Sequence, residues 1–206
     1  MRRFPFPNVP EFVTFDSLDS PAKIQDFLDS LPINFETRGD TCRSPRAALI
    51  SGSAHCVEGA LLGAAILWRH GRLPLLLDLE TTGKDDSHVV ALFREPSGWG
   101  AISKTNHGVL RFRDPIYKTL RELVLSYFHE YFLDTGEKTL RRYSKTPFNL
   151  LAFEDDWLTA EHPVWGVCED LADAPHTLIA DARTVRRLRR ADQIEIEMGK
   201  LTQWKR

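Results

Sequence analysis

The strongest feature of the hydrophobic pattern is an apolar stretch at 60–68, with the sequence ALLGAAILW. Gly52 and Ser53 precede it and are typical of the residues before a helix, while the His-Gly pair at 70–71 is a typical helix end. A helix that is apolar on nearly every side lies inside a domain rather than on its surface. The pattern therefore predicts a central buried helix, with Ser53 as its N-cap and Cys56 in its first turn.

Three segments with the composition of strands follow this helix. The run at 73–79 is continuously apolar, which is typical of a strand buried on both faces. Segment 88–94 is rich in valine and other strand-forming residues, and segment 99–104 follows a turn at 95–98. This order predicts an α+β fold in which the central helix packs on an antiparallel sheet.

The rest of the chain adds further elements around this core. Helical spacing or proline-marked starts predict helices at 21–31 and 45–50 and a long helix from Asp114-Pro115 to the loop at 134–136. A last strand is expected at 176–180 and a charged helix at 184–197. We expect a single domain over 1–206, with a core at about 40–135 and a C-terminal elaboration of helices and loops at 136–206.

Composition excludes several classes of function. The 206 residues carry a formal net charge of −2, so no bulk charge favours nucleic acid or a membrane as partner. The arginines at 183–190 are followed by Glu195 and Glu197, which favours a solvated, salt-bridged helix face over a nucleic-acid surface. No apolar run reaches the length that spans a bilayer, and the N-terminus lacks the apolar region of a signal peptide.

The three cysteines bear on the compartment. Their number is odd and no pair has C-x-x-C spacing, which argues against a disulfide framework and against a zinc ribbon. We therefore expect a reducing compartment and a cytoplasmic location. No cofactor or metal is expected.

Cys56 is the leading candidate for chemistry. The unpaired N–H groups and the dipole at a helix start favour a thiolate over a thiol. His88 opens a following strand, and a thiol nucleophile needs an imidazole that can take its proton. The alternative is structural, because a free cysteine is among the most buried residue types. Among the three thiols, Cys56 is expected to be the most reactive.

The order of these motifs carries a resemblance. The chain contains Gly52-x-x-x-Cys56, then Gly59-Ala60-x-x-x-Ala64-Ala65, a helix ending at Gly71, an apolar strand and His88-Val89-Val90. This arrangement resembles the transglutaminase-like superfamily, which has the papain-like cysteine hydrolase fold. Cys42-Arg43-Ser44-Pro45 and the segment 100–106 resemble one bacterial group within it. The resemblance covers roughly 40–135 and implies a nucleophilic cysteine on the core helix, with its histidine and an acidic or amide residue on adjacent strands.

One departure from the superfamily concerns the third catalytic residue. The superfamily usually has an aspartate on the strand after the histidine, where this chain has Ser103. Asn106 lies one strand-step further, and an amide oxygen is a fixed acceptor for an imidazole N–H. Asp78 and Asp86 are the other candidates. We predict that Asn106, rather than Ser103, orients His88.

The predicted function is cysteine-dependent acyl transfer at an amide or ester, as in a peptidase or amidase, with transglutamination less favoured. The substrate class is a peptide, amide or protein; the sequence makes no statement on oligomeric state. An alternative is a catalytically inactive papain-like domain that acts as a binding or structural module. A metal site from His55, Cys56, His88 and His107 is a weaker alternative, because adjacent side chains such as His55 and Cys56 do not converge easily.

Overall fold

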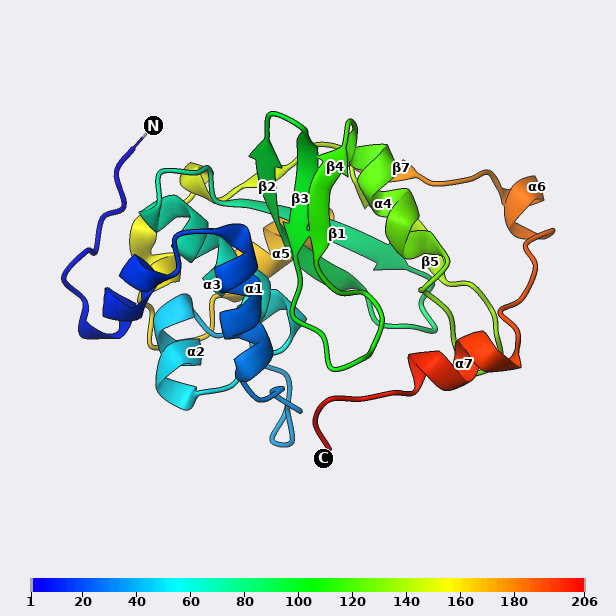
Figure 1. The fold of residues 1–206 in the computed structure, drawn as a ribbon, viewed down its shortest axis with the longest axis horizontal. Helices are drawn as coiled ribbons and strands as arrows, with labels where there is room; N and C mark the ends of the chain where they lie inside the picture. The colour runs from blue at the N-terminus through cyan, green and yellow to red at the C-terminus, as the bar shows by residue number, and fades with distance from the viewer. Residues whose placement is uncertain (1, 206) are drawn as a thin grey trace.

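The central helix of the fold carries the candidate cysteine. The computed structural model describes residues 2–205. Helix α3, Cys56–Arg69, lies in the interior, and every residue from Glu58 to Trp68 is buried. It packs mainly on strand β2, as the sequence predicts for a helix with no polar face (Figure 1). Its N-cap is His55 rather than the predicted Ser53, because the side chain of His55 accepts a bond from the Val57 N–H.

A seven-stranded antiparallel sheet forms the other half of the core. The strand order is β4-β3-β2-β1-β5-β7, with β6 paired to β1. The predicted α+β class with an antiparallel sheet is confirmed, and so is the pairing of the predicted strands. The strands are β1 (Leu75–Thr81), β2 (His88–Glu95), β3 (Gly98–Ile102), β4 (Arg113–Tyr117), β5 (Leu140–Ser144), β6 (Phe148–Asn149) and β7 (His176–Leu178).

Helices cover both faces of this sheet. Strand β1 alternates, so that Leu76 packs against the α3 side while Leu75, Leu77 and Leu79 pack against α4, Leu120–Phe128. The α3 side also holds three further α-helices and the turns of 3-10 helix. These are α1 (Pro21–Ser30), α2 (Pro45–Ser51), α5 (Trp165–Asp173), η1 (Pro10–Ser17), η2 (Leu150–Ala152) and η3 (Asp155–Leu158).

The long helix predicted from Asp114-Pro115 is wrong in its first part. Residues Arg113–Tyr117 form the edge strand β4, and α4 begins only after Thr119, whose side chain accepts a bond from the Glu122 N–H. An Asp-Pro pair also suits an edge strand, because the proline removes a donor that the free edge does not need. The composition at this point fits both structures, and pairing with β3 decides between them.

The charged helix predicted at 184–197 is also wrong, because it is two short helices. Helix α6 spans Ala182–Val185 and α7 spans Gln193–Gly199. Asp192 starts the second helix with a capping box that includes Glu195. A strong N-cap inside the predicted helix interrupts it. Strands β5 and β6 were not predicted.

The expectation that the cysteines are unpaired is corrected by a disulfide between Cys42 and Cys168. The two residues are 126 positions apart, and α5 brings Cys168 to the loop that carries Cys42, where the Val164 N–H donates to the Cys42 carbonyl at 2.7 Å. No sequence spacing could have shown this contact. Cys56 is the free cysteine. Within residues 2–205, none of the helices combines the length and apolar character needed to cross a membrane.

Candidate active site

Cys56 and His88 meet in one cleft. Cys56 is the first residue of α3 and is half-buried, and His88 is the first residue of β2. Both line a cleft of about 900 Å³ together with His55, and the two histidines lie close enough to the Cys56 thiol to lower its pKa. The structure thus brings together the two residues that the sequence singled out and adds a second histidine.

Close packing sets the position of the cysteine. Gly59 lies one turn into α3, where a Cβ atom would overlap the side chain of Lys104. The absence of a side chain lets the first turn of α3 rest directly on the chain that follows β3. Lys104 is itself fully buried, and its ammonium group donates to the carbonyls of Leu28 and Leu31 at the end of α1. Its positive charge is therefore directed away from the thiol.

Ser103 holds the ring of His88. The His88 Nε2 atom lies 2.8 Å from the Ser103 Oγ atom, and this hydroxyl donates its own proton to the Leu110 carbonyl at 2.5 Å. Because a hydroxyl has one proton, Ser103 must accept from His88. Nε2 therefore carries the ring proton, and Nδ1 is the nitrogen left to face the Cys56 thiol. The Ser103 hydroxyl has a fixed orientation because it donates its proton to the Leu110 carbonyl.

The backbone at Leu110 is built for this contact. Leu110 has φ of 60°, a left-handed conformation that costs a non-glycine residue roughly 1–3 kcal/mol. Its N–H donates to Glu130 Oε2 at 2.8 Å, and Glu130 is paired with Arg113 at 2.6 Å. The ion pair fixes the peptide on one side while the carbonyl holds Ser103 on the other. Strain of this kind persists only where surrounding contacts impose it.

His55 is the second ring beside the thiol. Its Nε2 lies 2.9 Å from the Thr41 carbonyl, which can only accept, so this nitrogen carries a proton. The carboxylates of Glu58 and Glu36 lie 3.5 and 3.6 Å from the same nitrogen. The Nδ1 atom is 3.3 Å from the Val57 N–H at the start of α3. His55 thus caps the start of α3 next to the thiol, and two carboxylates lie near its ring.

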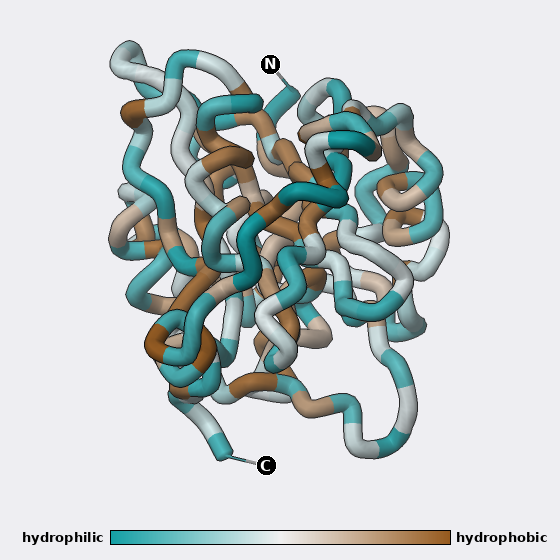
Figure 2. The backbone as a smooth tube through the Cα atoms, turned by 90° about the vertical axis from the view of Figure 1, so that its right-hand side faces the viewer, coloured by the Kyte–Doolittle hydropathy of each residue, from teal (hydrophilic) through white to brown (hydrophobic). Residues whose placement is uncertain are grey.

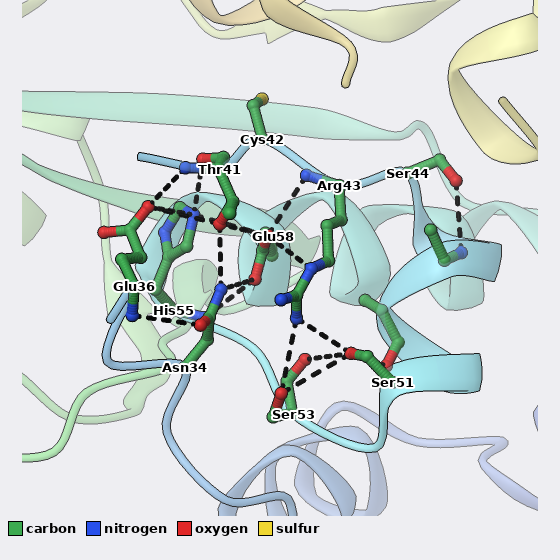
Figure 3. A network of polar contacts seen from close by, with 12 residues as sticks. Asn34, Glu36, Thr41, Cys42, Arg43, Ser44, Ser51, Ser53, His55 and Glu58 are labelled. Carbon is green, nitrogen blue, oxygen red and sulfur yellow. Dashed lines mark hydrogen bonds and ion pairs between the residues drawn. The ribbon is translucent and has the colours of Figure 1, made fainter. Parts of the chain in front are cut away.

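A buried carboxylate organises this side of the cleft. Glu58 is fully buried and accepts hydrogen bonds from the side chains of Asn34 and Thr41 and from the backbone N–H groups of Arg43 and His55, at 2.9–3.2 Å. Figure 3 shows these bonds converging on the carboxylate from the loop before α2 and from the start of α3. Four donors satisfy the buried charge, as burial requires. The network fixes the loop that places the Thr41 carbonyl on His55.

The two histidines change the acidity of the thiol. Burial by itself raises the pKa of Cys56, but hydrogen bonds and positive charge from His55 and His88 outweigh it and lower the pKa to about 5. Burial lowers the pKa of His55, while the thiolate, Glu58 and Glu36 together raise it to about 9. The two shifts favour a thiolate and a protonated His55 at neutral pH, and protonation requires the His55 Nδ1 atom to release the Val57 N–H.

The other candidates for the third residue lie elsewhere. Asn106 exchanges two bonds with the Trp204 backbone, donating at 3.0 Å and accepting at 2.8 Å, so that it holds the C-terminal segment although it lines the cleft. Asp78 pairs with His176 at 3.1 Å, and the Asp86 side chain is exposed. Of the four residues considered, Ser103 is the one whose side chain contacts His88. The sequence argument favoured Asn106 because it treated the serine hydroxyl as free to rotate.

The positions of His55 and Glu58 beside the thiol were not predicted from the sequence. A signal was present, because Glu58 is the one charged residue between Cys56 and Arg69 and occupies the third position of a capping box. A carboxylate at that place in an otherwise apolar helix needs a local partner. The left-handed backbone at Leu110 had no such signal, because the position is not glycine.

The metal alternative gains no support from the geometry. Between residues 2 and 205, no three histidine, cysteine or acidic side chains are grouped so that they could hold a metal ion. His107 lines the cleft but places its Nδ1 at the Gly199 carbonyl, 3.0 Å away. Comparison with protein-family models gave no match, and a search of curated proteins gave none either.

Proposed function

We propose that the protein is a cysteine-dependent acyl-transfer enzyme, with Cys56 as nucleophile, His88 as proton carrier and Ser103 as the residue that orients His88. One observation carries the proposal. The thiol and the His88 imidazole line the same open cleft, and the Nε2 atom of that imidazole is tied through Ser103 to the Leu110 carbonyl. A nucleophile, a base and an orienting group are the parts that covalent acyl transfer needs.

In the first half-reaction the Cys56 thiolate attacks the carbonyl carbon of an amide or ester. We expect a backbone N–H group at the start of α3 to contribute to stabilising the oxyanion of the tetrahedral intermediate. The bond to the leaving amine or alcohol breaks, and the leaving group takes from His88 Nδ1 the proton that this nitrogen accepted from the Cys56 thiol. The product is a thioester on Cys56.

In the second half-reaction water or an amine attacks the thioester. His88 Nδ1 takes the proton of this nucleophile while Nε2 stays bonded to Ser103. The carbon–sulfur bond then breaks and releases the thiolate. His55 supplies positive charge next to the sulfur at each stage where it is anionic, because its own protonated form is favoured by Glu58 and Glu36.

This mechanism supports assignment to the transglutaminase-like superfamily with a papain-like core. A carboxylate is usual where this chain has Ser103, and that difference favours the rival proposal of an inactive binding or structural module. The bond from Ser103 to the Leu110 carbonyl favours the enzyme over the inactive module, because it makes the Ser103 oxygen a fixed acceptor in place of a carboxylate. The proposed substrates are peptides, amides or proteins.

The predicted compartment rests on the cysteines. A cytoplasmic location was expected because no cysteine pair was foreseen. The Cys42–Cys168 disulfide removes that premise, since structural disulfides persist mainly in oxidising compartments. Mass mapping of the native protein without reductant tests the pairing directly.

The catalytic proposal is tested with para-nitrophenyl acetate, an activated ester that needs no knowledge of the natural substrate. We expect a burst of nitrophenol, an acetyl group on Cys56 found by mass spectrometry, and its slow release as turnover continues. His107→Gln is the matched control, because His107 lines the same cleft but bonds to Gly199. A thiol that alkylates readily but never forms a thioester that turns over would establish the inactive module instead.

A further inference from the structure

A second cavity lies apart from the cysteine cleft and shares no lining residue with it. Its volume is about 250 Å³, below the ~300–1,000 Å³ typical of drug-sized ligand pockets. It is lined by residues in and just before β5 and by residues in and just after α6. Figure 2 shows these segments on the side that faces the viewer. The lining residues are Glu137, Lys138, Arg141, Val185, Arg186, Leu188, Arg189 and Arg190.

The charges around this cavity do not balance. Its acidic member, Glu137, is paired with Lys84 at 3.2 Å, and Arg189 is paired with Asp192 at 3.0 Å. Among residues 2–205, the other four cations have no carboxylate within ion-pair distance. Arg141 and Arg190 each donate to a backbone carbonyl, which leaves their positive charge uncompensated. The four are Lys138, Arg141, Arg186 and Arg190.

Lys138 is the unusual member of this set. It is 6% exposed, and its ammonium group has no hydrogen-bond acceptor or carboxylate partner among the described residues. Its Nζ atom is not among the buried unpaired polar atoms, so the side chain is packed along its length while the ammonium group reaches solvent. The Lys138 backbone bridges to Phe132, so the side chain belongs to an ordered segment rather than to a free loop. An ammonium group held by packing at the wall of a basic cavity is available to an anion.

We propose that this cavity binds a small phosphate-like dianion, either free phosphate or the phosphate group of a monoester. Lys138 supplies a point charge at its wall, on a side chain that is held by packing. Arg141, Arg186 and Arg190 supply guanidinium groups, which suit the paired oxygens of a phosphate. The volume admits a phosphate group and little more, so a nucleic-acid backbone is not the expected occupant.

Titration calorimetry with inorganic phosphate on the full chain tests the proposal, with sodium chloride matched for ionic strength. We expect saturable one-to-one binding, weakened about tenfold in Lys138→Met and about three- to tenfold in Arg186→Gln, since charge-assisted bonds are lost. Arg186 is exposed, so its replacement keeps the result interpretable if Lys138→Met fails to fold. Phosphoserine forms a second arm, and tighter binding than that of phosphate assigns the site to monoesters.

The matched control is Arg187→Gln, because Arg187 is a neighbouring exposed arginine that does not line the cavity. An equal loss of binding in Arg187→Gln and Arg186→Gln would overturn the proposal, because it would show general attraction to a basic surface. Absence of binding to both phosphate and phosphoserine would also overturn it. Tighter binding of a short RNA than of phosphate, equally weakened by both arginine variants, would identify a polyanion surface instead.

Discussion

Two histidines in this sheet are held by similar bonds, yet only one can take part in proton transfer. His88 gives Nε2 to Ser103 and keeps Nδ1 for the thiol in an open cleft. His176 uses both nitrogens, with Nδ1 2.6 Å from the Ala174 carbonyl and Nε2 3.1 Å from Asp78. Burial raises the pKa of Asp78, and neither residue of that pair lines the cleft. A buried histidine–anion pair becomes an active-site candidate only when one nitrogen remains uncommitted and the cleft reaches it.

The largest expected effect comes from removing the nucleophile. Cys56→Ala is expected to abolish both acetylation by para-nitrophenyl acetate and labelling by iodoacetamide, because the other two cysteines are joined in a disulfide. The measurement is mass mapping of labelled peptides without reductant. Labelling of Cys42 or Cys168 in the native protein would show that the disulfide is absent and that reactivity is not confined to the cleft.

Replacing His88 or His176 distinguishes the catalytic role of the first from the structural role of the second. His88→Gln is expected to lower turnover about 10²- to 10⁴-fold, the usual loss for a general acid–base, with little change in the free energy of unfolding. His176→Gln is expected to leave turnover near normal and to destabilise the fold by about 3–5 kcal/mol, because it leaves Asp78 buried without its partner. Ester hydrolysis and urea unfolding measure the two effects. Loss of turnover in His176→Gln, with loss of stability alone in His88→Gln, would contradict the comparison.

The pH dependence of alkylation examines the ion pair at Cys56. With the thiol pKa lowered to about 5, the rate is expected to rise through that pH and to be flat near neutrality, whereas an ordinary thiol rises near pH ~8.5. His55→Gln is expected to move the rise upward by about one to two pH units, the usual effect of losing a nearby opposite charge. An unchanged profile in His55→Gln would show that His88 alone holds the thiolate.

The same shifts determine how stability depends on pH. The lowered pKa of Cys56 contributes stability that is complete above the ordinary thiol pKa and is lost as pH falls toward about 5. The raised pKa of His55 contributes stability that is complete below its ordinary value of 6.5 and is lost as pH rises through about 9. The pair therefore contributes most between roughly pH 6.5 and 8.5. Because the two slopes cancel across this window, His55→Gln should remove the falling contribution and leave the free energy of unfolding rising with pH there.

The smallest effect belongs to the residue that orients His88. Ser103→Ala is expected to reduce turnover about three- to tenfold, since it removes one hydrogen bond of about 1–1.5 kcal/mol from the ring. Asn106→Ala is the matched comparison, and it should leave turnover unchanged while loosening the segment around Trp204. Limited proteolysis reports the second effect. A loss in Asn106→Ala without one in Ser103→Ala would restore the original assignment.

The sequence predicted the frame of the site better than its detail. Strong local patterns predict the apolar helix after Cys56, the strand that begins at His88 and the strand that ends just before Ser103. These elements bring Cys56 and His88 together. The contact between Ser103 and His88 could not be predicted, because it depends on Leu110, where tertiary contacts impose a conformation that a leucine rarely adopts. The Asp114-Pro115 pair was misread because its local preference is the same for a helix start and for an edge strand.

The low pKa of Cys56 also makes the protein its own folding probe. The thiolate depends on His88 from β2 and on His55, whose positive charge is favoured by Glu36 and Glu58, and an unfolded chain cannot assemble these contacts. At mildly acidic pH a denatured molecule therefore has an ordinary, almost unreactive thiol, while a native molecule reacts. A single alkylation pulse at about pH 6 would then count native molecules in a mixture, without a spectroscopic signal or a known substrate.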